Sequence, residues 1–282
     1  MYNALIKIFL KIKILEGFFY LLSNNISRGE KMVSINNPTQ NNIKSIDKQI
    51  EMLQQKFKRI KEKGYVIGYQ NNLTSVGATF EKLIGKDFDS LSKPDFFDIE
   101  IKTKLVHSKT CISLININPT GPTNKEINRL KNIYGYTDKR DNKLKTLNIV
   151  INAKKVEKIR NNFLFKLEID RTMNRLYICI LDLNLNLIEK RVYWDLDIIK
   201  NRVYQKLKIL ALVYAFTTKR NKMVYFKYYK INFYILKDFN TFLKLIESGK
   251  IKISMKQGNY YTKEKYGQTY SHGISFVIKK ED

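Results

Sequence analysis

The sequence predicts an α+β fold, in which a mixed central β-sheet is flanked by helices. Three observations support this class. Apolar residues recur at helical spacing in several short stretches, and strand-like runs follow one another directly between residues 147 and 194. The regular alternation of strand and helix that a doubly wound parallel sheet requires does not occur in the pattern. With 282 residues, 44% of them hydrophobic, the chain can bury a core for one or two domains.

Helices are predicted where apolar residues recur three or four positions apart. The clearest stripe of apolar residues consists of Ile43, Ile46, Ile50, Leu53, Phe57 and Ile60. It predicts a helix that ends at Gly64. A second helix is expected over residues 76–83, ended by Gly85. Further helices are expected over residues 126–134, 196–216 and 239–247.

Strands are predicted where apolar and polar residues alternate, or where a short apolar run lies between turn residues. They cover residues 96–105, 111–117, 147–153, 163–169, 176–183, 187–194, 223–236, 251–255 and 274–278. The four strands from 147 to 194 are consecutive, which predicts a meander.

The first 22 residues are apolar but carry four charges, at Lys7, Lys11, Lys13 and Glu16. They leave no clean apolar run of about 18 residues, so neither a membrane span nor a signal segment is predicted. A basic amphipathic helix on a membrane surface is the alternative. Residues 28–31 can be encoded by purine-rich codons that resemble a ribosome-binding site, so we also consider a translation start at Met32.

The charge of the chain favours a polyanionic partner. Its 52 Lys and Arg residues against 26 Asp and Glu give a net charge of +26, and nucleic acid is the commonest partner of such a protein. A coding sequence rich in A and T also enriches Lys, so charge alone does not identify the partner. Cys111 and Cys179 form no CxxC pair, which argues against a zinc site or a disulfide framework and predicts a cytoplasmic protein.

The stretch from Pro94 to Lys102 carries the chemistry. On an extended strand, Glu100 and Lys102 point to the same face, while the isoleucines between them point into the apolar layer. Asp95 lies at the entry to this strand and can bend toward the same point. Two carboxylates with an open side suit Mg²⁺, and a nearby ammonium can orient an attacking water and hold a phosphate.

The alternative interpretation is that these charges are the solvated face of an edge strand. The segment upstream favours the catalytic interpretation. Glu81, 14 residues before Asp95, is flanked by apolar residues on a predicted helix. A carboxylate pressed against a core needs a partner, which a metal ion or its water shell would provide.

The order of these residues resembles the PD-(D/E)xK restriction endonucleases of the MvaI/BcnI group, which are similar to the mismatch-repair nicking enzyme MutH. Beyond the active-site signature, the resemblance includes Tyr134-Gly135, the segment 239–251 and His272-Gly273, in the order that the group uses. It implies the fold of that group, with a catalytic lobe over residues 43–195 and a DNA-recognition lobe over 196–282 around a cleft. Residues 1–42 would be an extension and linker.

Carried over by residue, the resemblance implies Asp95 and Glu100 as metal ligands, Lys102 as the catalytic lysine and Glu81 as a supporting acid. His272 would match a histidine placed at the DNA near the active site. The group's pattern leads us to expect Asp-His-Gly, but Ser271 precedes His272 here, so the carboxylate that would tune the imidazole is missing. Contact with a base edge or a phosphate survives this change.

Residues 256–268 mix amide, aromatic and basic side chains around two glycines, a composition able to contact bases. An ordinary loop in a Lys-rich protein has the same composition. The candidate DNA contacts are Lys104, His107, Lys256, Gln257, Tyr260, Tyr261, Lys263 and His272.

From these features we expect a Mg²⁺-dependent type II restriction endonuclease that hydrolyses double-stranded DNA at a short specific sequence and leaves a 5′-phosphate. The resemblance implies a monomer, and a restriction role implies a DNA methyltransferase encoded nearby; no membrane partner is expected. Two alternatives stay open. One is a MutH-like repair nickase with the same catalytic strand, and the other is a DNA-binding protein without catalysis.

Overall fold

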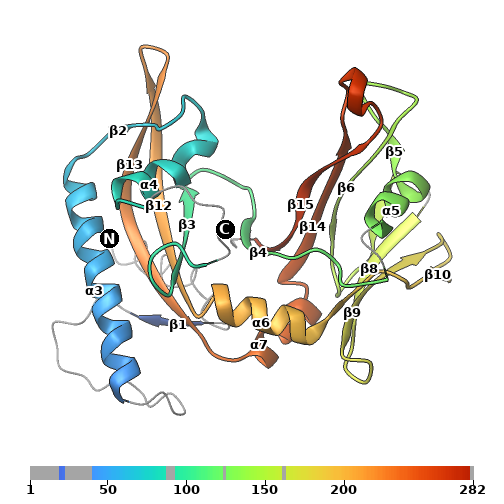
Figure 1. Ribbon diagram of the computed structural model, residues 1–282, viewed down its shortest axis with the longest axis horizontal. Helices are drawn as coiled ribbons and strands as arrows, with labels where there is room; N and C mark the ends of the chain where they lie inside the picture. The colour runs from blue at the N-terminus through green and yellow to red at the C-terminus, as the bar shows by residue number, and fades with distance from the viewer. Residues whose placement is uncertain (1–18, 23–39, 87–92, 123–124, 161–162, 280–282) are drawn as a thin grey trace, which may run out of the picture. The chain divides into compact units, whose positions relative to one another are not determined.

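The computed structural model describes residues 19–22, 40–86, 93–122, 125–160 and 163–279 (Figure 1). The chain forms two compact units, each assembled from two main stretches of sequence. Unit 1 combines the chain up to Thr110 with Tyr204–Lys237, and unit 2 combines Cys111–Val203 with Asp238–Glu281. None of the helices described is long and apolar enough to cross a membrane.

Unit 1 is built on a five-stranded mixed sheet with the strand order β1-β13-β12-β3, and β2 also pairs with β13. The strands are β1 (Phe19–Leu22), β2 (Val66–Ile67), β3 (Ile99–Leu105), β12 (Ile209–Arg220) and β13 (Met223–Leu236). β3 runs parallel to β12, and the other pairs are antiparallel. The unit also contains α3 (Gln40–Glu62), the 3-10 turn η1 (Leu73–Ser75) and α4 (Val76–Leu83).

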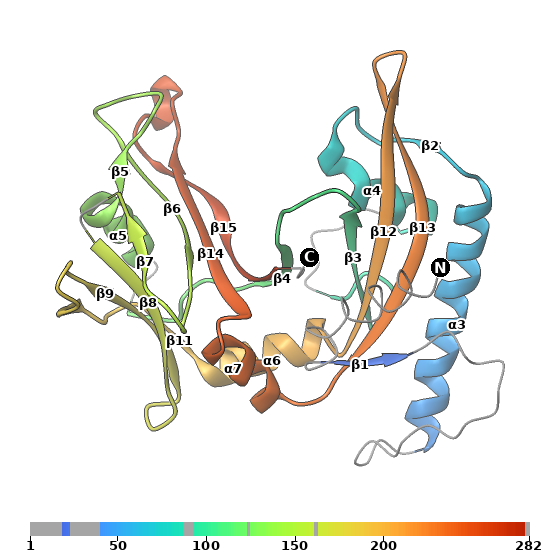
Figure 2. The same ribbon diagram turned by 180° about the vertical axis from the view of Figure 1, so that it is seen from behind.

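The core of unit 1 lies between its helices and one face of the sheet, an arrangement visible from both sides of the molecule (Figures 1 and 2). The predicted stripe on α3 supplies Ile50, Leu53, Phe57 and Ile60, all buried. Lys56 on α3 also donates a hydrogen bond of 2.8 Å to the Ile84 carbonyl at the end of α4. Ile43 lies outside the residues whose side chains are described.

Unit 2 contains two antiparallel sheets of five strands each. The first has the order β4-β15-β14-β6-β5: β4 (Ile112–Asn116), β15 (Thr269–Ile278), β14 (Ile251–Asn259), β6 (Lys145–Ile151) and β5 (Tyr136–Thr137). The second has the order β10-β9-β8-β7, with β11 also paired to β9: β10 (Leu187–Glu189), β9 (Arg175–Leu181), β8 (Phe163–Asp170), β7 (Glu157–Ile159) and β11 (Tyr193–Asp195). Three of the four strands of the predicted meander, 163–169, 176–183 and 187–194, lie in this second sheet; the first, β6, pairs with β14 and β5 in the first sheet instead.

Four further helical segments complete the described elements. They are α5 (Glu126–Tyr134), α6 (Leu196–Lys206), α7 (Phe239–Glu247) and the 3-10 turn η2 (Lys263–Lys265). The boundary between the units falls within α6: Leu196–Val203 belongs to unit 2, and the last turn, from Tyr204, belongs to unit 1. The helices predicted over 126–134 and 239–247 have the predicted bounds.

The α+β class is confirmed, with three sheets among the described residues in place of one central sheet. The helix predicted over 196–216 is wrong in its second half, because Ile209–Phe216 belongs to β12. Residues 209–215 of β12 are all buried, so residues 209–216 are apolar at every position and carry no strand alternation. Strands β14 and β15 are longer than predicted, since they continue through polar residues.

The two units also divide the chain differently from the predicted lobes 43–195 and 196–282. The hairpin β12–β13 returns to unit 1, because β12 pairs with β3 along seven residue positions, from Ile99 to Leu105. The C-terminal hairpin β14–β15 instead joins β4 and β6 in unit 2.

Candidate active site

The chain enters β3 through a tight turn. Phe96 and Ile99 exchange two backbone hydrogen bonds, with N···O distances of 2.9 and 2.8 Å. Phe97 takes up the turn with a φ of 51°, in the left-handed region that residues with side chains rarely adopt. Because the chain doubles back here, Asp95 returns to the level of Ile101 on the strand.

Asp95 is held beside β3 by its own carboxylate. One oxygen, Oδ2, accepts a hydrogen bond of 2.9 Å from the Ile101 backbone N–H. The other, Oδ1, lies 2.5 Å from the Lys86 ammonium. The backbone contact fixes the direction of the carboxylate, and Lys86 balances its charge.

Glu100 is a buried carboxylate between two ammonium groups. It is only 2% exposed. Its Oε1 lies 2.5 Å from Lys102 Nζ, and its Oε2 lies 3.1 Å from Lys206 Nζ at the end of α6. A buried charge requires partners of this kind. Its burial contradicts the interpretation that Glu100 belongs to a solvated strand face.

Glu81 on α4 shares the electrostatic environment of these residues. Burial raises the pKa of the Glu81 carboxyl, the Asp95 carboxylate raises it further, and Lys86 and Lys102 lower it in part. Glu100 also raises this pKa. Lys86 Nζ lies 3.9 Å from Glu81 Oε2 as well as beside Asp95. The structure therefore brings Glu81, Asp95, Glu100 and Lys102 together.

Gly77 allows α4 to approach β3 closely. A Cβ atom at this position would lie 3.3 Å from Thr103 Oγ1 on β3 and 3.9 Å from Glu81 Oε1. Glycine is thus the residue that lets the helix carrying Glu81 pack against the strand carrying Glu100 and Lys102.

The donor set fits a hard divalent cation. Three carboxylates interact here: the pKa of Glu81 is raised first by burial and then by the charges of Asp95 and Glu100. Among the residues described, no three His, Cys, Asp or Glu side chains are close enough to enclose a metal ion. Asp95 and Glu100 offer carboxylate oxygens, the donor type that a hard cation such as Mg²⁺ prefers.

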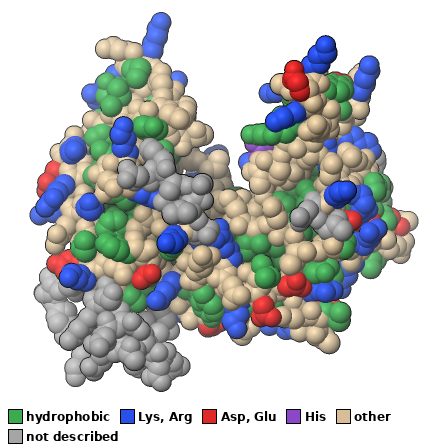
Figure 3. Space-filling view, in the orientation of Figure 1, with side chains coloured by type: hydrophobic (Ala, Val, Ile, Leu, Met, Phe, Trp, Pro, Cys, Tyr) green, Lys and Arg blue, Asp and Glu red, His purple; other side chains and the backbone are tan. Residues whose placement is uncertain are grey.

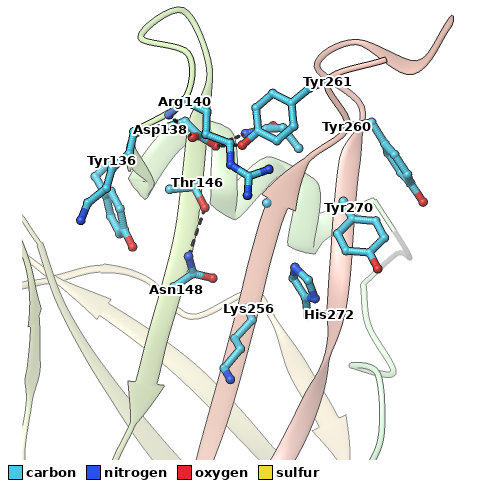
Figure 4. A pocket seen from close by; sticks show the side chains of 13 residues that line it. Tyr136, Asp138, Arg140, Thr146, Asn148, Lys256, Tyr260, Tyr261, Tyr270 and His272 are labelled. Atoms are coloured by element: carbon cyan, nitrogen blue, oxygen red, sulfur yellow. Dashed lines mark hydrogen bonds between the residues drawn. The ribbon is translucent and has the colours of Figure 1, made fainter. Parts of the chain in front are cut away.

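Several of the predicted DNA contacts line a pocket of about 930 Å³ in unit 2 (Figure 4). The pocket lies on the first sheet of this unit, where the β5–β6 turn faces the β14–β15 hairpin. Lys256, Tyr260, Tyr261 and His272 all contribute to its lining. The His272 ring packs edge-on against Tyr270, with 4.5 Å between ring centroids.

The family model of the MvaI/BcnI restriction endonucleases matches residues 54–282. The chain belongs to the MvaI/BcnI restriction endonuclease family.

Two solved structures are similar to this member of the family. The first is the restriction endonuclease MvaI in complex with its cognate DNA substrate, with 30% sequence identity and a TM-score of 0.73 over 81% of this chain and 92% of that chain. The second is MvaI in the absence of DNA, with 29% identity and a TM-score of 0.54 over 82% and 92%. No curated protein matches the chain.

Two of the DNA contacts predicted for this family member are buried. Lys104 is 4% exposed, and its ammonium donates to the Thr110 carbonyl and hydroxyl and contacts the Ser108 hydroxyl. It closes the turn after β3. Gln257 is 0% exposed, because it points to the inner face of β14. These two positions are corrections: neither side chain is available to DNA.

The other predicted contacts are more accessible. His107, Lys256, Lys263 and His272 are exposed, and Tyr261 is 39% exposed. Tyr260, half-buried, packs against Tyr270 with 4.9 Å between ring centroids. His107 belongs to unit 1 and His272 to unit 2. The roles of all six at DNA, and that of His272 in cleavage by this family member, stay predictions.

Sequence analysis missed two lysines of the site. Lys206 reaches Glu100 from 106 positions away, and no local pattern links the two residues. Lys86 lies five residues after Glu81 and directly after Gly85, where the chain leaves the helix.

Proposed function

We propose that this chain is a Mg²⁺-dependent type II restriction endonuclease in which Asp95 and Glu100 hold the metal ion and Lys102 acts in catalysis. Its family consists of restriction endonucleases, and the similar MvaI structure contains cognate DNA. The observation that carries the proposal is the buried Glu100 carboxylate beside Lys102, close to Asp95 and Glu81. Duplex DNA is the proposed substrate, and hydrolysis at a short specific sequence is the proposed reaction.

The side chains have distinct tasks in this proposal. When bound by Asp95 and Glu100, Mg²⁺ supplies the positive charge that stabilises the charge developing on the phosphate. The Lys102 side chain is 27% exposed, so its ammonium can contact both an attacking water and a phosphate oxygen while Glu100 holds it in place. Lys206 holds the opposite oxygen of Glu100 and so fixes the carboxylate plane.

The surface charge is suited to this substrate. Lys and Arg side chains are spread over both units on the face shown in Figure 3. A net charge of +26 supplies the phosphate contacts that hold a duplex in any sequence. We propose that the protein acts as a monomer and that a DNA methyltransferase protects host DNA at the same sequence.

Purified protein, plasmid DNA and Mg²⁺ test the proposal. Discrete linear fragments are expected. Nicked circles without fragments would favour a repair nickase, and a gel shift without cleavage would indicate a DNA-binding protein. Omission of Mg²⁺ with a chelator should abolish cleavage, and its return should restore it.

Two substitutions test the site itself. Lys102→Ala and Glu100→Gln are expected to abolish cleavage of the plasmid while DNA binding persists in a gel shift. Lys109→Ala is the matched control, because Lys109 is an exposed lysine beyond the same strand. Full activity in either site variant would remove the assignment.

A further inference from the structure

A buried polar network lies beneath the pocket of unit 2. The Lys131 ammonium, 2% exposed, donates a hydrogen bond of 2.5 Å to Asn259 Oδ1. The Asn259 amide nitrogen donates to the Lys145 carbonyl at 2.9 Å and to Asp138 Oδ2 at 3.0 Å. Lys131, Asn259 and Asp138 are thus joined by hydrogen bonds into one continuous network, and each of these buried side chains has a partner in it.

The network ends at Asp138, which holds two residues at the pocket surface. The Tyr261 hydroxyl donates to Asp138 Oδ2 at 2.6 Å, and the Arg140 backbone N–H donates to Asp138 Oδ1 at 2.9 Å. Asp138 is 8% exposed, whereas Tyr261 is 39% exposed. One carboxylate thus fixes both the aromatic ring and the backbone of the neighbouring arginine.

The Arg140 guanidinium packs over the Tyr261 ring, with 5.2 Å from its central carbon to the ring centroid. Figure 4 shows it beside Tyr261, pointing into the space enclosed by the residues drawn. Within the described part of the chain, no hydrogen bond or ion pair joins this guanidinium to another side chain. Its fork of N–H donors is held in position and is available to a ligand.

We propose that Arg140 recognises a guanine of the DNA site through its O6 and N7 atoms, and that Tyr261 and Asp138 are positioning residues for it. The proposal rests on the proposed function. Guanine is the base whose major-groove edge presents two acceptors to such a fork. A phosphate would also accept from Arg140, but a contact that only tracks the backbone does not need a buried network to orient it.

Cleavage of a duplex library with a randomised window tests the proposal. The ends made by the full-length protein with Mg²⁺ are sequenced, and they define the recognition sequence. If the unaltered protein cuts no sequence preferentially, the proposed function fails before Arg140 is examined. If it cuts a defined sequence, the same library is cut with Arg140→Ala, and with Lys139→Ala as the control from the same exposed turn.

Arg140→Ala should lose the preference for guanine at one position of the recognition sequence. In a palindromic site it should also lose the preference at the symmetry-related position, and the base preferences at all other positions should persist. Cleavage of the original sequence should fall roughly 10- to 100-fold, the range for one bidentate base contact. Replacement of that guanine by 7-deazaguanine should slow the unaltered protein and leave Arg140→Ala unaffected. Lys139→Ala should keep every base preference.

Tyr261→Phe keeps the ring but removes the hydroxyl that donates to Asp138. It should weaken the preference at the same guanine and at no other position. The proposal is overturned if Arg140→Ala keeps all preferences. It is equally overturned if Arg140→Ala lowers the base preference at every position to the same extent and the salt dependence of DNA binding falls by about one phosphate contact. That result would indicate that Arg140 contacts a phosphate. If Arg140→Ala is folded but cuts no duplex, the duplexes that it binds are selected from the same library and sequenced, and their base preferences replace the cleavage data. Loss of all DNA binding overturns the proposal.

Discussion

The Glu100 carboxylate depends on its two lysines, since a buried charge without a partner is strongly unfavourable. When one lysine is replaced, the other still pairs with Glu100, so single substitutions can test the two contacts separately. Lys102 is the more exposed of the two lysines, with 27% of its side chain accessible against 15% for Lys206. In the proposed mechanism, Lys102 therefore contacts the substrate and Lys206 orients Glu100.

Replacement of Lys206 by methionine should slow cleavage at saturating DNA without weakening binding, because it frees one oxygen of Glu100. The free energy of unfolding should fall by about 1.5–3 kcal/mol, the contribution of a hydrogen bond to a charged group. Single-turnover cleavage and chemical denaturation measure the two effects, and Lys206→Arg should restore part of both. Lys208→Ala, an exposed lysine two residues on, is the control. Equal behaviour of Lys206→Met and the control would contradict this role.

Asp138 should make stability depend on acid pH. Burial alone would raise its pKa, but hydrogen bonds from Tyr261, the Arg140 backbone and Asn259 outweigh burial and lower it below the ordinary 3.8. The folded state therefore binds this proton less tightly than the unfolded chain. The contribution to stability is present above pH 3.8 and is lost as the pH falls through the lowered pKa.

Asp138→Asn should accordingly lower the melting temperature at pH 7 and have a smaller effect near the acid limit of folding. Thermal unfolding of both proteins between pH 3 and pH 7 measures the difference. Glu264→Gln, an exposed acidic residue of the same unit, is the control. A difference that stays constant over the range would contradict the assignment.

The predictability of the site follows the distance between its residues along the chain. Asp95, Glu100 and Lys102 lie within eight residues: strand periodicity predicts a common face for Glu100 and Lys102, and the position of Asp95 at the strand entry predicts that it joins them. Lys206 joins them through the pairing of β12 with β3, which no local pattern contains. Composition predicts Gln257 as a DNA contact, yet the direction of a strand residue depends on register, and Gln257 is buried on β14.

At the scale of elements, α3 is an integral part of unit 1 although the family match begins at residue 54, within the helix. It packs on the sheet through its apolar stripe. Gln49 also contacts the turn before β3: its Oε1 accepts from the Asp98 backbone N–H at 3.1 Å. The N-terminal half of α3 therefore supports the turn that directs Asp95.

Leu53→Ala should lower the free energy of unfolding by about 2–5 kcal/mol, because Leu53 is 0% exposed in the core. Met52→Ala, one position away and 36% exposed, should change it by less than about 0.5 kcal/mol. Urea denaturation of both variants measures the contrast. Similar losses in the two variants would show that α3 does not pack as described.

Gly77→Val should separate α4 from β3, since even a Cβ at this position reaches 3.3 Å from Thr103 Oγ1. A loss of about 1–3 kcal/mol is expected from overpacking. Cleavage should fall as well, because the same helix carries Glu81. Removal of the opposing atoms by Thr103→Ala should recover part of both losses. If the double variant is no better than Gly77→Val, another contact limits the approach of the helix.

Helices with one apolar face were the easiest elements to predict, and the central strand was the hardest. The stripe on α3 and the bounds of α5 and α7 follow from helical spacing and terminal glycines. Residues 209–216 are apolar throughout, and their strand conformation depends on β3 and β13 on either side. Tertiary pairing thus decided what local sequence left open.

At the scale of the whole molecule, the charge of +26 predicts binding that weakens steeply with salt. A protein with about six to ten phosphate contacts loses roughly 10³–10⁵ in affinity between 50 and 200 mM salt. Gel shifts of the Lys102→Ala variant over this range measure the dependence without cleavage. A nearly constant affinity would show that the excess positive charge lies away from the DNA.

The interleaving of the two units has a consequence for engineering and for the exchange of specificity between relatives. A single crossover placed between β6 and β14 of two homologous genes would transplant β14–β15 without β5 and β6 and would split the first sheet of unit 2 between parents. A chimera that exchanges unit 2 alone, and so keeps both units of single parentage, must take residues 111–203 and 238–281 together and leave the β12–β13 hairpin behind.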